Sequence, residues 1–223
     1  MKRMNRTRIK ICGLTREADV DAAVRAGADA IGFVFYPRSS RFIEPARAAE
    51  LARRLPPFVT PVGLFVNATP TDIQRATDAM PHLLLQFHGD ETPAACDSAA
   101  RPYLRAARMA PGVDLLDFAA SYPHALALLL DTHVEAYGGS GKAFDWSLIP
   151  ANVPRPVVLS GGLHAGNVIQ GITQVRPWAV DVSSGVESAK GIKDAAAIRR
   201  FCDAVREADG IVGRTTSTAS PPP

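Results

Sequence analysis

The amino-acid sequence predicts a single (β/α)8 TIM barrel. Short runs of β-branched or apolar residues alternate along the chain with Ala-rich amphipathic segments. The runs are largely apolar throughout, which is typical of parallel strands covered by helices on both faces of the sheet. Eight such alternations within 223 residues fit a TIM barrel better than a doubly wound open sheet.

The elements are expected in a regular order. The first strand, 9–12, precedes a helix at 16–25 that Thr15 caps and Gly27 closes. The second strand, 30–35, precedes a helix at 44–55 with Pro45 in its first turn. The later strands and helices are expected at 62–66 and 71–80, 82–87 and from Pro93, 103–109 and 113–121, 125–131, 157–160 and 164–173, and 178–182 and 194–207.

One domain is expected, because no linker interrupts this array. We assign residues 8–208 to the barrel and residues 1–7 to an N-terminal extension. Residues 213–223 are rich in Ser, Thr and Pro and lack apolar anchors, so they are predicted to form a disordered tail.

Composition excludes several classes of protein. The net charge is only +3 and no basic block with aromatic residues occurs, which argues against a nucleic-acid partner. No apolar stretch approaches the ~20 residues that span a bilayer, and the basic N-terminus lacks the apolar run of a signal peptide. We therefore expect a cytoplasmic protein with no membrane association. No long unpaired apolar face stands out, so we expect a monomer.

Cysteine and histidine spacing gives no metal or cofactor site. The three cysteines lie far apart, which fits neither a disulfide framework nor a zinc site. The five histidines form no H-E-x-x-H pair. The segment 138–142 resembles a nucleotide-binding loop but lacks the first Gly and the Ser or Thr of a P-loop. It is expected to be a flexible loop that closes over substrate.

Catalytic groups are expected at the carboxyl ends of the strands, where TIM barrels place their active sites. Cys12 ends the first strand, where a lowered thiol pKa would make it a base or nucleophile; buried cysteines are otherwise often inert core residues. Asp131 ends an apolar strand, and desolvation there favours the protonated acid. A helix-capping or loop-tethering role for Asp131 is an equal alternative on position alone.

Two glycine-containing turns predict a phosphate site. Gly161 and Gly162 follow the seventh strand, and Ser184 and Gly185 follow the eighth. TIM barrels commonly bind phosphate with backbone N–H groups at these two positions. Two ordinary tight turns are the alternative. In the loop 36–43, Arg41 is a candidate to pair with a carboxylate or phosphate, although most surface arginines do neither.

Seven blocks of sequence together resemble the phosphoribosylanthranilate isomerase family of tryptophan biosynthesis. They occur in the family's order between residues 8 and 208. The blocks are KICGLT at 10–15, GFVFYP at 32–37 with Ser39 and Arg41, QxHG at 86–89, LLDT at 129–132, YGGSGK at 137–142 with FDW at 144–146, LSGGL at 159–163, and VDVSSGVE at 180–187.

The resemblance implies an Amadori rearrangement of N-(5-phosphoribosyl)anthranilate without metal or organic cofactor. It implies that Asp131 is the general acid that opens the furanose ring. It implies that Cys12 is the general base that removes the proton from C2. Arg41 would hold the anthranilate end, and the turns containing Gly161, Gly162, Ser184 and Gly185 would hold the phosphate.

Two alternatives remain open at this point. A related phosphoribosyl aminoaldose isomerase of histidine biosynthesis uses two aspartates, so Cys12 argues against it. A non-catalytic barrel that binds a phosphorylated ligand would have no need for both Cys12 and Asp131.

Overall fold

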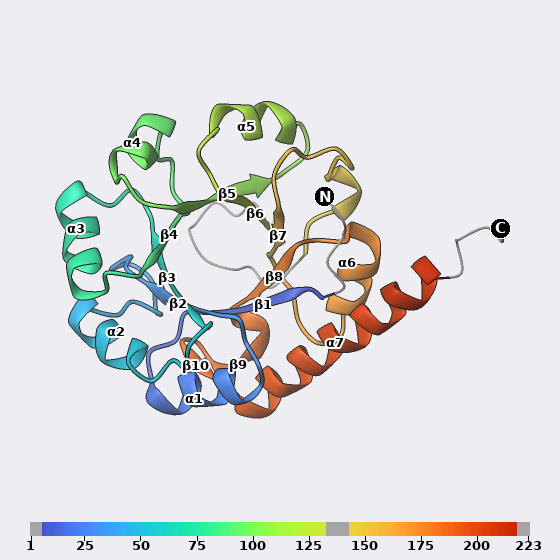
Figure 1. Cartoon of the computed structure of the whole chain (residues 1–223), viewed down its shortest axis with the longest axis horizontal. Coiled ribbons are helices and arrows are strands. Elements are labelled where there is room, and N and C mark those ends of the chain that lie inside the picture. The colour runs from blue at the N-terminus through green and yellow to red at the C-terminus, as the bar shows by residue number, and fades with distance from the viewer. Residues whose placement is uncertain (1–5, 133–142, 218–223) are drawn as a thin grey trace.

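The computed structural model describes residues 6–132 and 143–217, with side chains as far as Arg214. Eight parallel strands close into a barrel in the order β1 to β8, which confirms the predicted fold. Figure 1 shows the helices arranged around the strands. The strands are β1 (Arg8–Cys12), β2 (Ala30–Val34), β3 (Thr60–Phe65), β4 (Leu84–Phe87), β5 (Tyr103–Met109), β6 (Ala127–Thr132), β7 (Val157–Leu159) and β8 (Ala179–Val182). The helices are α1 (Glu17–Arg25), α2 (Pro45–Ala52), α3 (Pro70–Ala79), α4 (Pro93–Ser98), α5 (Leu115–Ser121), α6 (Val168–Val175) and α7 (Ala195–Ser217).

Helix starts follow the local sequence. Proline stands at the first turn of α2, α3 and α4, where its missing N–H has no helical partner to lose. The side chains of Thr69, Thr92 and Asp114 accept hydrogen bonds from the first turns of α3, α4 and α5. The cap that the sequence predicts at Thr15 is absent, because α1 begins at Glu17 after Arg16.

The connections around β6 and β8 differ from a regular repeat. Between β6 and β7, the described residues contain a short 3-10 helix, η1 (Trp146–Leu148), in place of an α-helix. The loop predicted at 138–142 lies outside the described residues. After β8, a second 3-10 helix, η2 (Ser184–Val186), leads into a hairpin of β9 (Glu187–Ala189) and β10 (Ile192–Lys193). The sequence does not predict this hairpin.

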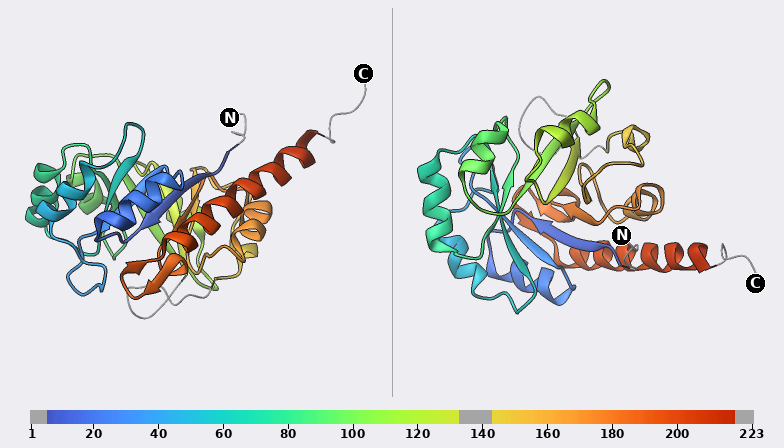
Figure 2. Two further views of the ribbon diagram at one scale, coloured as in Figure 1. Left: turned by 90° about the horizontal axis from the view of Figure 1, so that it is seen from below. Right: turned by 45° about the horizontal axis from the view of Figure 1, so that its top comes forward.

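Both chain ends depart from their predicted limits. Thr7, assigned to the N-terminal extension, is buried and bonded through its N–H and hydroxyl to Asp209 of α7. Helix α7 continues to Ser217, so residues 213–217 are helical and the predicted disorder there is wrong. Once a helix is nucleated, each added residue costs little, so poor helix formers can extend it. Figure 2 shows α7 running beyond the ring of helices.

The core has two layers because successive strand side chains point to opposite faces. Outward-facing residues such as Ile9 and Ile11 pack within the main hydrophobic cluster, which also contains buried residues of the helices. Inward-facing residues such as Val62 and Leu129 fill the barrel interior. On β1, the buried inward-facing side chains are Lys10 and Cys12, so this strand places an ammonium group and a thiol inside the barrel. No helix within the described residues is both long and apolar enough to cross a membrane.

Phe201 provides a test of how much α7 contributes to stability. Its side chain is fully buried on α7, which packs against α6 and α1. Phe201→Ala should lower the free energy of unfolding by about 3–5 kcal/mol, because a large cavity replaces the ring. Urea denaturation measures this loss. Arg199→Ala, at a side chain that is 81% exposed on the same helix, is the control and should change it by less than about 0.5 kcal/mol. Equal effects of the two variants would contradict the packing described.

Candidate active site

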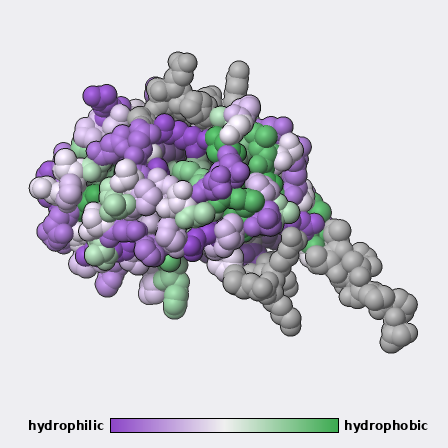
Figure 3. Space-filling model, turned by 90° about the horizontal axis from the view of Figure 1, so that it is seen from above, coloured by the Kyte–Doolittle hydropathy of each residue, from purple (hydrophilic) through white to green (hydrophobic). Residues whose placement is uncertain are grey.

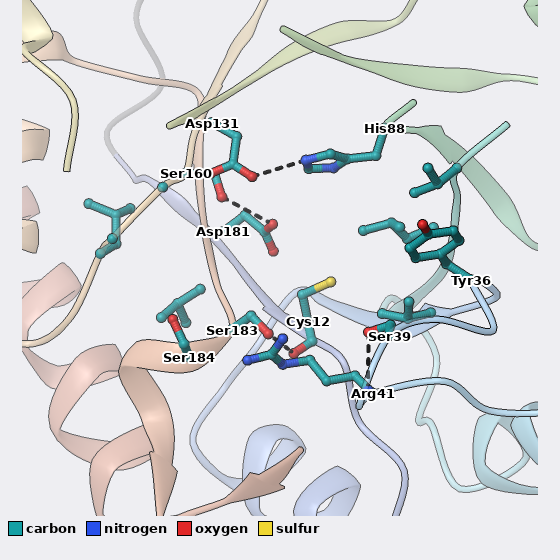
Figure 4. A pocket seen from close by; sticks show the side chains of 17 residues that line it. Cys12, Tyr36, Ser39, Arg41, His88, Asp131, Ser160, Asp181, Ser183 and Ser184 are labelled. Atoms are coloured by element: carbon teal, nitrogen blue, oxygen red, sulfur yellow. Dashed lines mark hydrogen bonds and ion pairs between the residues drawn. The ribbon is translucent and has the colours of Figure 1, made fainter. Parts of the chain in front are cut away.

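A pocket at the carboxyl ends of the strands brings together most of the predicted site residues (Figure 4). The predicted residues that line it are Cys12, Arg41, Asp131, Gly161, Gly162 and Ser184. Gly185 is not among the lining residues. A Cβ atom there would overlap the carbonyl oxygen of Leu163, so Gly185 allows the turns after β7 and β8 to pack together.

Cys12 occupies the last position of β1 and is only 4% exposed. Its strand neighbour in the sheet is Gly32 of β2, and a Cβ atom on Gly32 would lie 2.7 Å from Cys12 Sγ. Burial raises the pKa of the thiol above its ordinary value of 9.0, which outweighs the lowering by Lys10. The direction is opposite to the lowered pKa expected from sequence, because the strand end is desolvated.

A buried ion pair lies beside Cys12. Lys10 Nζ is 2.8 Å from Asp181 Oδ1, and both side chains are nearly inaccessible to solvent. Ser160 Oγ donates to the other oxygen of Asp181 over 3.4 Å. Burial alone would lower the pKa of Lys10, but Asp181 raises it, so the lysine remains charged. The floor of the pocket therefore carries a fixed pair of opposite charges.

Asp131 is held by one backbone group and one histidine. Its Oδ1 accepts a hydrogen bond from the N–H of Thr132 (2.8 Å), and its Oδ2 lies 2.9 Å from His88 Nε2. His88 Nδ1 in turn lies 3.1 Å from the amide nitrogen of Gln86. Figure 4 shows His88 and Asp131 meeting across the pocket.

This chain of three side chains has two proton arrangements that share the same atom positions. With the Gln86 amide N–H donating to Nδ1, His88 carries its proton on Nε2 and donates it to an ionised Asp131. With the amide turned over, Nδ1–H donates to the Gln86 oxygen, and Nε2 accepts from a protonated Asp131. The second arrangement leaves Asp131 in the form that an acid needs.

Arg41 is clamped by Glu187. Its Nε and Nη2 donate to the two carboxylate oxygens of Glu187 over 2.7 and 2.8 Å, and Lys193 Nζ lies 2.8 Å from Oε1. Burial alone would raise the pKa of Glu187, but the hydrogen bonds from Arg41 and Lys193 lower it. Among the described residues Arg41 Nη1 has no hydrogen-bond partner, so it is the group available to an anion. Gly13 makes room for the side chain, since a Cβ atom there would lie 2.5 Å from Arg41 Cδ.

Gly161 and Gly162 turn the chain back after β7 with φ angles of +76° and +65°. Glycine adopts this left-handed backbone at little cost. A Cβ atom on Gly161 would lie 2.5 Å from the nitrogen of Thr132 and 2.9 Å from Asp131 Oδ1. The turn predicted to bind phosphate therefore lies directly against the predicted acid.

Several residues in or next to the pocket were not assigned a role from the sequence. His88 and Asp181 line the pocket, and Lys10, Gln86, Glu187 and Lys193 bind to residues that line it. Lys10 and Asp181 are charged residues within otherwise apolar strands, a signal that strand alternation could have detected. His88 follows β4 directly, at a strand end. Lys193 gives no such signal, because the unpredicted hairpin brings it beside Ser183 and Glu187. Asn67, another strand-end residue, does not line the pocket; its N–H donates to Glu91 instead.

Comparison with known sequences identifies the family of this chain. The family model described as N-(5'phosphoribosyl)anthranilate (PRA) isomerase matches residues 9–204. A relative in Leptothrix cholodnii, an N-(5'-phosphoribosyl)anthranilate isomerase, is 73% identical over 204 residues, which cover 92% of this chain and 93% of the relative.

Solved structures agree with the fold. The phosphoribosyl anthranilate isomerase of Thermotoga maritima is 42% identical, with a TM-score of 0.83, over 90% of this chain and 99% of the other. A structure of such an isomerase with reduced 1-(o-carboxyphenylamino)-1-deoxyribulose 5-phosphate is 39% identical, with a TM-score of 0.79, over the same shares. Another Thermotoga maritima structure, 38% identical with a TM-score of 0.78 over the same shares, is of monomers made from a dimeric isomerase.

The matching family model spans most of the chain, and the relative is far more than 30% identical over nearly its whole length. The chain belongs to the N-(5'-phosphoribosyl)anthranilate isomerase family.

Proposed function

We propose that this enzyme converts N-(5'-phosphoribosyl)anthranilate to 1-(2-carboxyphenylamino)-1-deoxyribulose 5-phosphate in tryptophan biosynthesis. The observation that carries the proposal is one shared pocket. It holds a thiol on β1, a carboxyl group on β6, and a glycine turn against that carboxyl group. The reaction is an acid–base rearrangement, which needs these groups at separate points along one substrate.

Asp131 acts as the general acid in this proposal. It donates its proton to the furanose ring oxygen, and the bond from C1 to that oxygen breaks. The anilino nitrogen supplies the electron pair that forms the C1=N bond of a protonated Schiff base. The adjacent phosphate group of the substrate adds negative charge beside Asp131, which favours the protonated carboxyl group. His88 accepts a hydrogen bond from Asp131 in the second proton arrangement.

Cys12 acts as the general base. Its thiolate removes the proton from C2. The C2–H electron pair forms a C1=C2 bond, and the π electrons of the protonated C1=N bond move to nitrogen, which gives an enolamine. The enolamine then gains a proton at C1 and loses the proton of its C2 hydroxyl group, which gives the ketone. Burial of Cys12 excludes water from the reacting atoms.

The two ends of the substrate are assigned to the two anion sites of the pocket. The N–H groups of Gly161, Gly162 and Ser184 bind the phosphate, with Gly185 supporting the turn. Arg41 binds the anthranilate carboxylate through Nη1, while Glu187 fixes the guanidinium plane.

We further propose that the chain is monomeric and works in the cytoplasm. The exposed large hydrophobic side chains among the described residues lie at separate places: Phe58, Val113, Leu126, Leu148 and Ile192. Figure 3 shows a largely hydrophilic face with hydrophobic residues in smaller groups. All three cysteines are buried and unpaired, which suits a reducing compartment. Light scattering coupled to size-exclusion chromatography would report the mass in solution.

Gly161→Ala tests the phosphate site. The added methyl group collides with Thr132 and Asp131 and strains a backbone with positive φ. We expect KM to rise about 10–100-fold, because phosphate hydrogen bonds of about 1.5–3 kcal/mol are lost. The inhibition constant of inorganic phosphate should rise in parallel. Gly112→Ala is the matched control: its φ is +88°, but no atom lies within 4 Å of the new methyl group. A normal KM in Gly161→Ala would refute the assignment.

Cys12→Ser tests the base. The hydroxyl group keeps the size of the thiol but is a far poorer base, so turnover should fall by about 10²–10⁴-fold. Affinity for a product analogue should change little, as measured by calorimetry. Cys96→Ala, at a buried cysteine of α4 that does not line the pocket, should retain turnover. Near-normal turnover of Cys12→Ser would remove Cys12 from the mechanism.

Asp131→Asn tests the acid. The amide keeps the shape and lacks the transferable proton, so ring opening should become rate-limiting. Steady-state assays should show a collapse of turnover on the closed furanose substrate. The defect should be much smaller on a pre-opened analogue, because the protonation step is bypassed. Equal losses on both substrates would mean that Asp131 supports the structure of the site and does not act as the acid.

A further inference from the structure

Lys10 and Asp181 form a buried ion pair whose position needs an explanation. Their side chains are 5% and 6% exposed, deep in the barrel interior. Burying two charges requires desolvation, and well-packed apolar residues of similar volume often stabilise a protein as much or more. Stability alone is therefore a weak reason for this pair. Charged groups buried beside a reactive side chain are typical of functional sites.

The lysine lies next to the proposed base on β1 as well as beside the aspartate. Lys10 and Cys12 are two residues apart on β1, so their side chains point to the same face of the strand. The register of β1 against β8 places Lys10 opposite Asp181. Lys10 Nζ lies 2.8 Å from Asp181 Oδ1, and Lys10 and Cys12 are adjacent positions on the inward face of β1. The positive charge of Lys10 lowers the pKa of the Cys12 thiol.

Other charged groups around Cys12 have partners of their own. Arg41 and Lys193 share the single carboxylate of Glu187. His88 and Asp131 form a pair with each other on β4 and β6. Of the two lysines that lower the pKa of Cys12, Lys10 has the larger effect and Lys193 the smaller one.

The protonation states of Cys12 and Lys10 explain why both members of the ion pair are needed to stabilise the thiolate. A cysteine acts as a base only as the thiolate. Burial disfavours that thiolate, and the positive charge of Lys10 opposes the effect of burial. Burial would also favour a neutral lysine, but Asp181 keeps Lys10 protonated. The carboxylate thus maintains the charge of the lysine, and the lysine stabilises the charge of the sulfur.

We propose that Lys10 is a positioning residue for the base: its ammonium group, kept charged by Asp181, stabilises the Cys12 thiolate that removes the C2 proton. The inference rests on the proposed role of Cys12. In the step itself the proton moves from C2 to Sγ. Lys10 keeps all its protons, and no bond forms at Nζ.

The test measures ionisation of Cys12 directly. Thiolate absorbance near 240 nm is titrated with pH, and the titration of the corresponding Cys12→Ser protein is subtracted to isolate Cys12. Lys10→Met should raise the apparent pKa of Cys12 by about 1–2 units, as expected for loss of a neighbouring cation. The limb of the kcat/KM profile that rises with pH should shift by the same amount, with kcat/KM near neutral pH falling about 10–100-fold. Lys10→Arg retains the cation and should restore most of the ionisation.

A double variant controls for the destabilisation that an unpaired buried charge would cause. Lys10→Met leaves Asp181 buried without its partner, which destabilises the barrel. Lys10→Met/Asp181→Asn removes both charges and keeps the shapes. The apparent pKa of Cys12 in this double variant should rise, but by less than in Lys10→Met. The lysine lowers that pKa more than the aspartate raises it.

If the ionisation of Cys12 is unchanged in folded Lys10→Met or in folded Lys10→Met/Asp181→Asn, the inference is overturned, even if turnover falls. Such a result would leave Cys12 as the base, provided that Cys12→Ser is inactive. Near-normal turnover of Cys12→Ser would instead overturn the base role and this inference with it.

Discussion

The pairing of β1 with β8 is the contact on which the site depends. It closes the barrel, with Arg8 opposite Ala179 and Ile11 opposite Val182. The same register brings Lys10 beside Asp181, although 171 residues separate them in sequence. Just beyond the strand ends, Ser183 donates a hydrogen bond to the carbonyl of Cys12. Closure therefore brings together the proposed base, the Lys10–Asp181 ion pair and the start of the second turn proposed to bind phosphate.

The proposed acid and base receive opposite kinds of support from the barrel. Cys12 must lose a proton to act, and it is buried beside a cation. Asp131 must hold a proton to act, and it lies against a histidine and the turn assigned to the substrate phosphate. Two titratable groups with different surroundings can hold opposite protonation states at one pH. At Cys12 burial raises the pKa of the thiol, and the positive charge of Lys10 opposes that rise.

Local patterns predicted most of the fold. All eight strands lie where apolar runs occur, and β5 (Tyr103–Met109) has the bounds expected from sequence. The hairpin of β9 and β10 was not predicted, because its strands are two or three residues long and partly polar. The short helix η1 between β6 and β7 was not predicted either. Such connections depend on contacts between distant segments, which the periodicity of apolar residues in the sequence does not predict.

The site was predicted less completely than the fold. Cys12, Arg41 and Asp131 were identifiable because they end strands or belong to a family block. Their partners were harder to assign, because a pairing such as Arg41 with Glu187 joins residues that are 146 apart in sequence. Gly185 was expected to touch the ligand, whereas its place against Leu163 gives it a supporting role in the turn.

A crystal structure of this enzyme with a reduced analogue of the product would test the assignment of acid and base. We expect phosphate on the Gly161–Gly162 and Ser184 turns and the aromatic carboxylate at Arg41. Asp131 should be within hydrogen-bond distance of the C4 hydroxyl group, the former ring oxygen. Cys12 Sγ should lie about 3–3.5 Å from C2, as a reacting pair requires. A reversed ligand, with phosphate at Arg41 or with Cys12 facing C4 in place of C2, would contradict the assignment of acid and base.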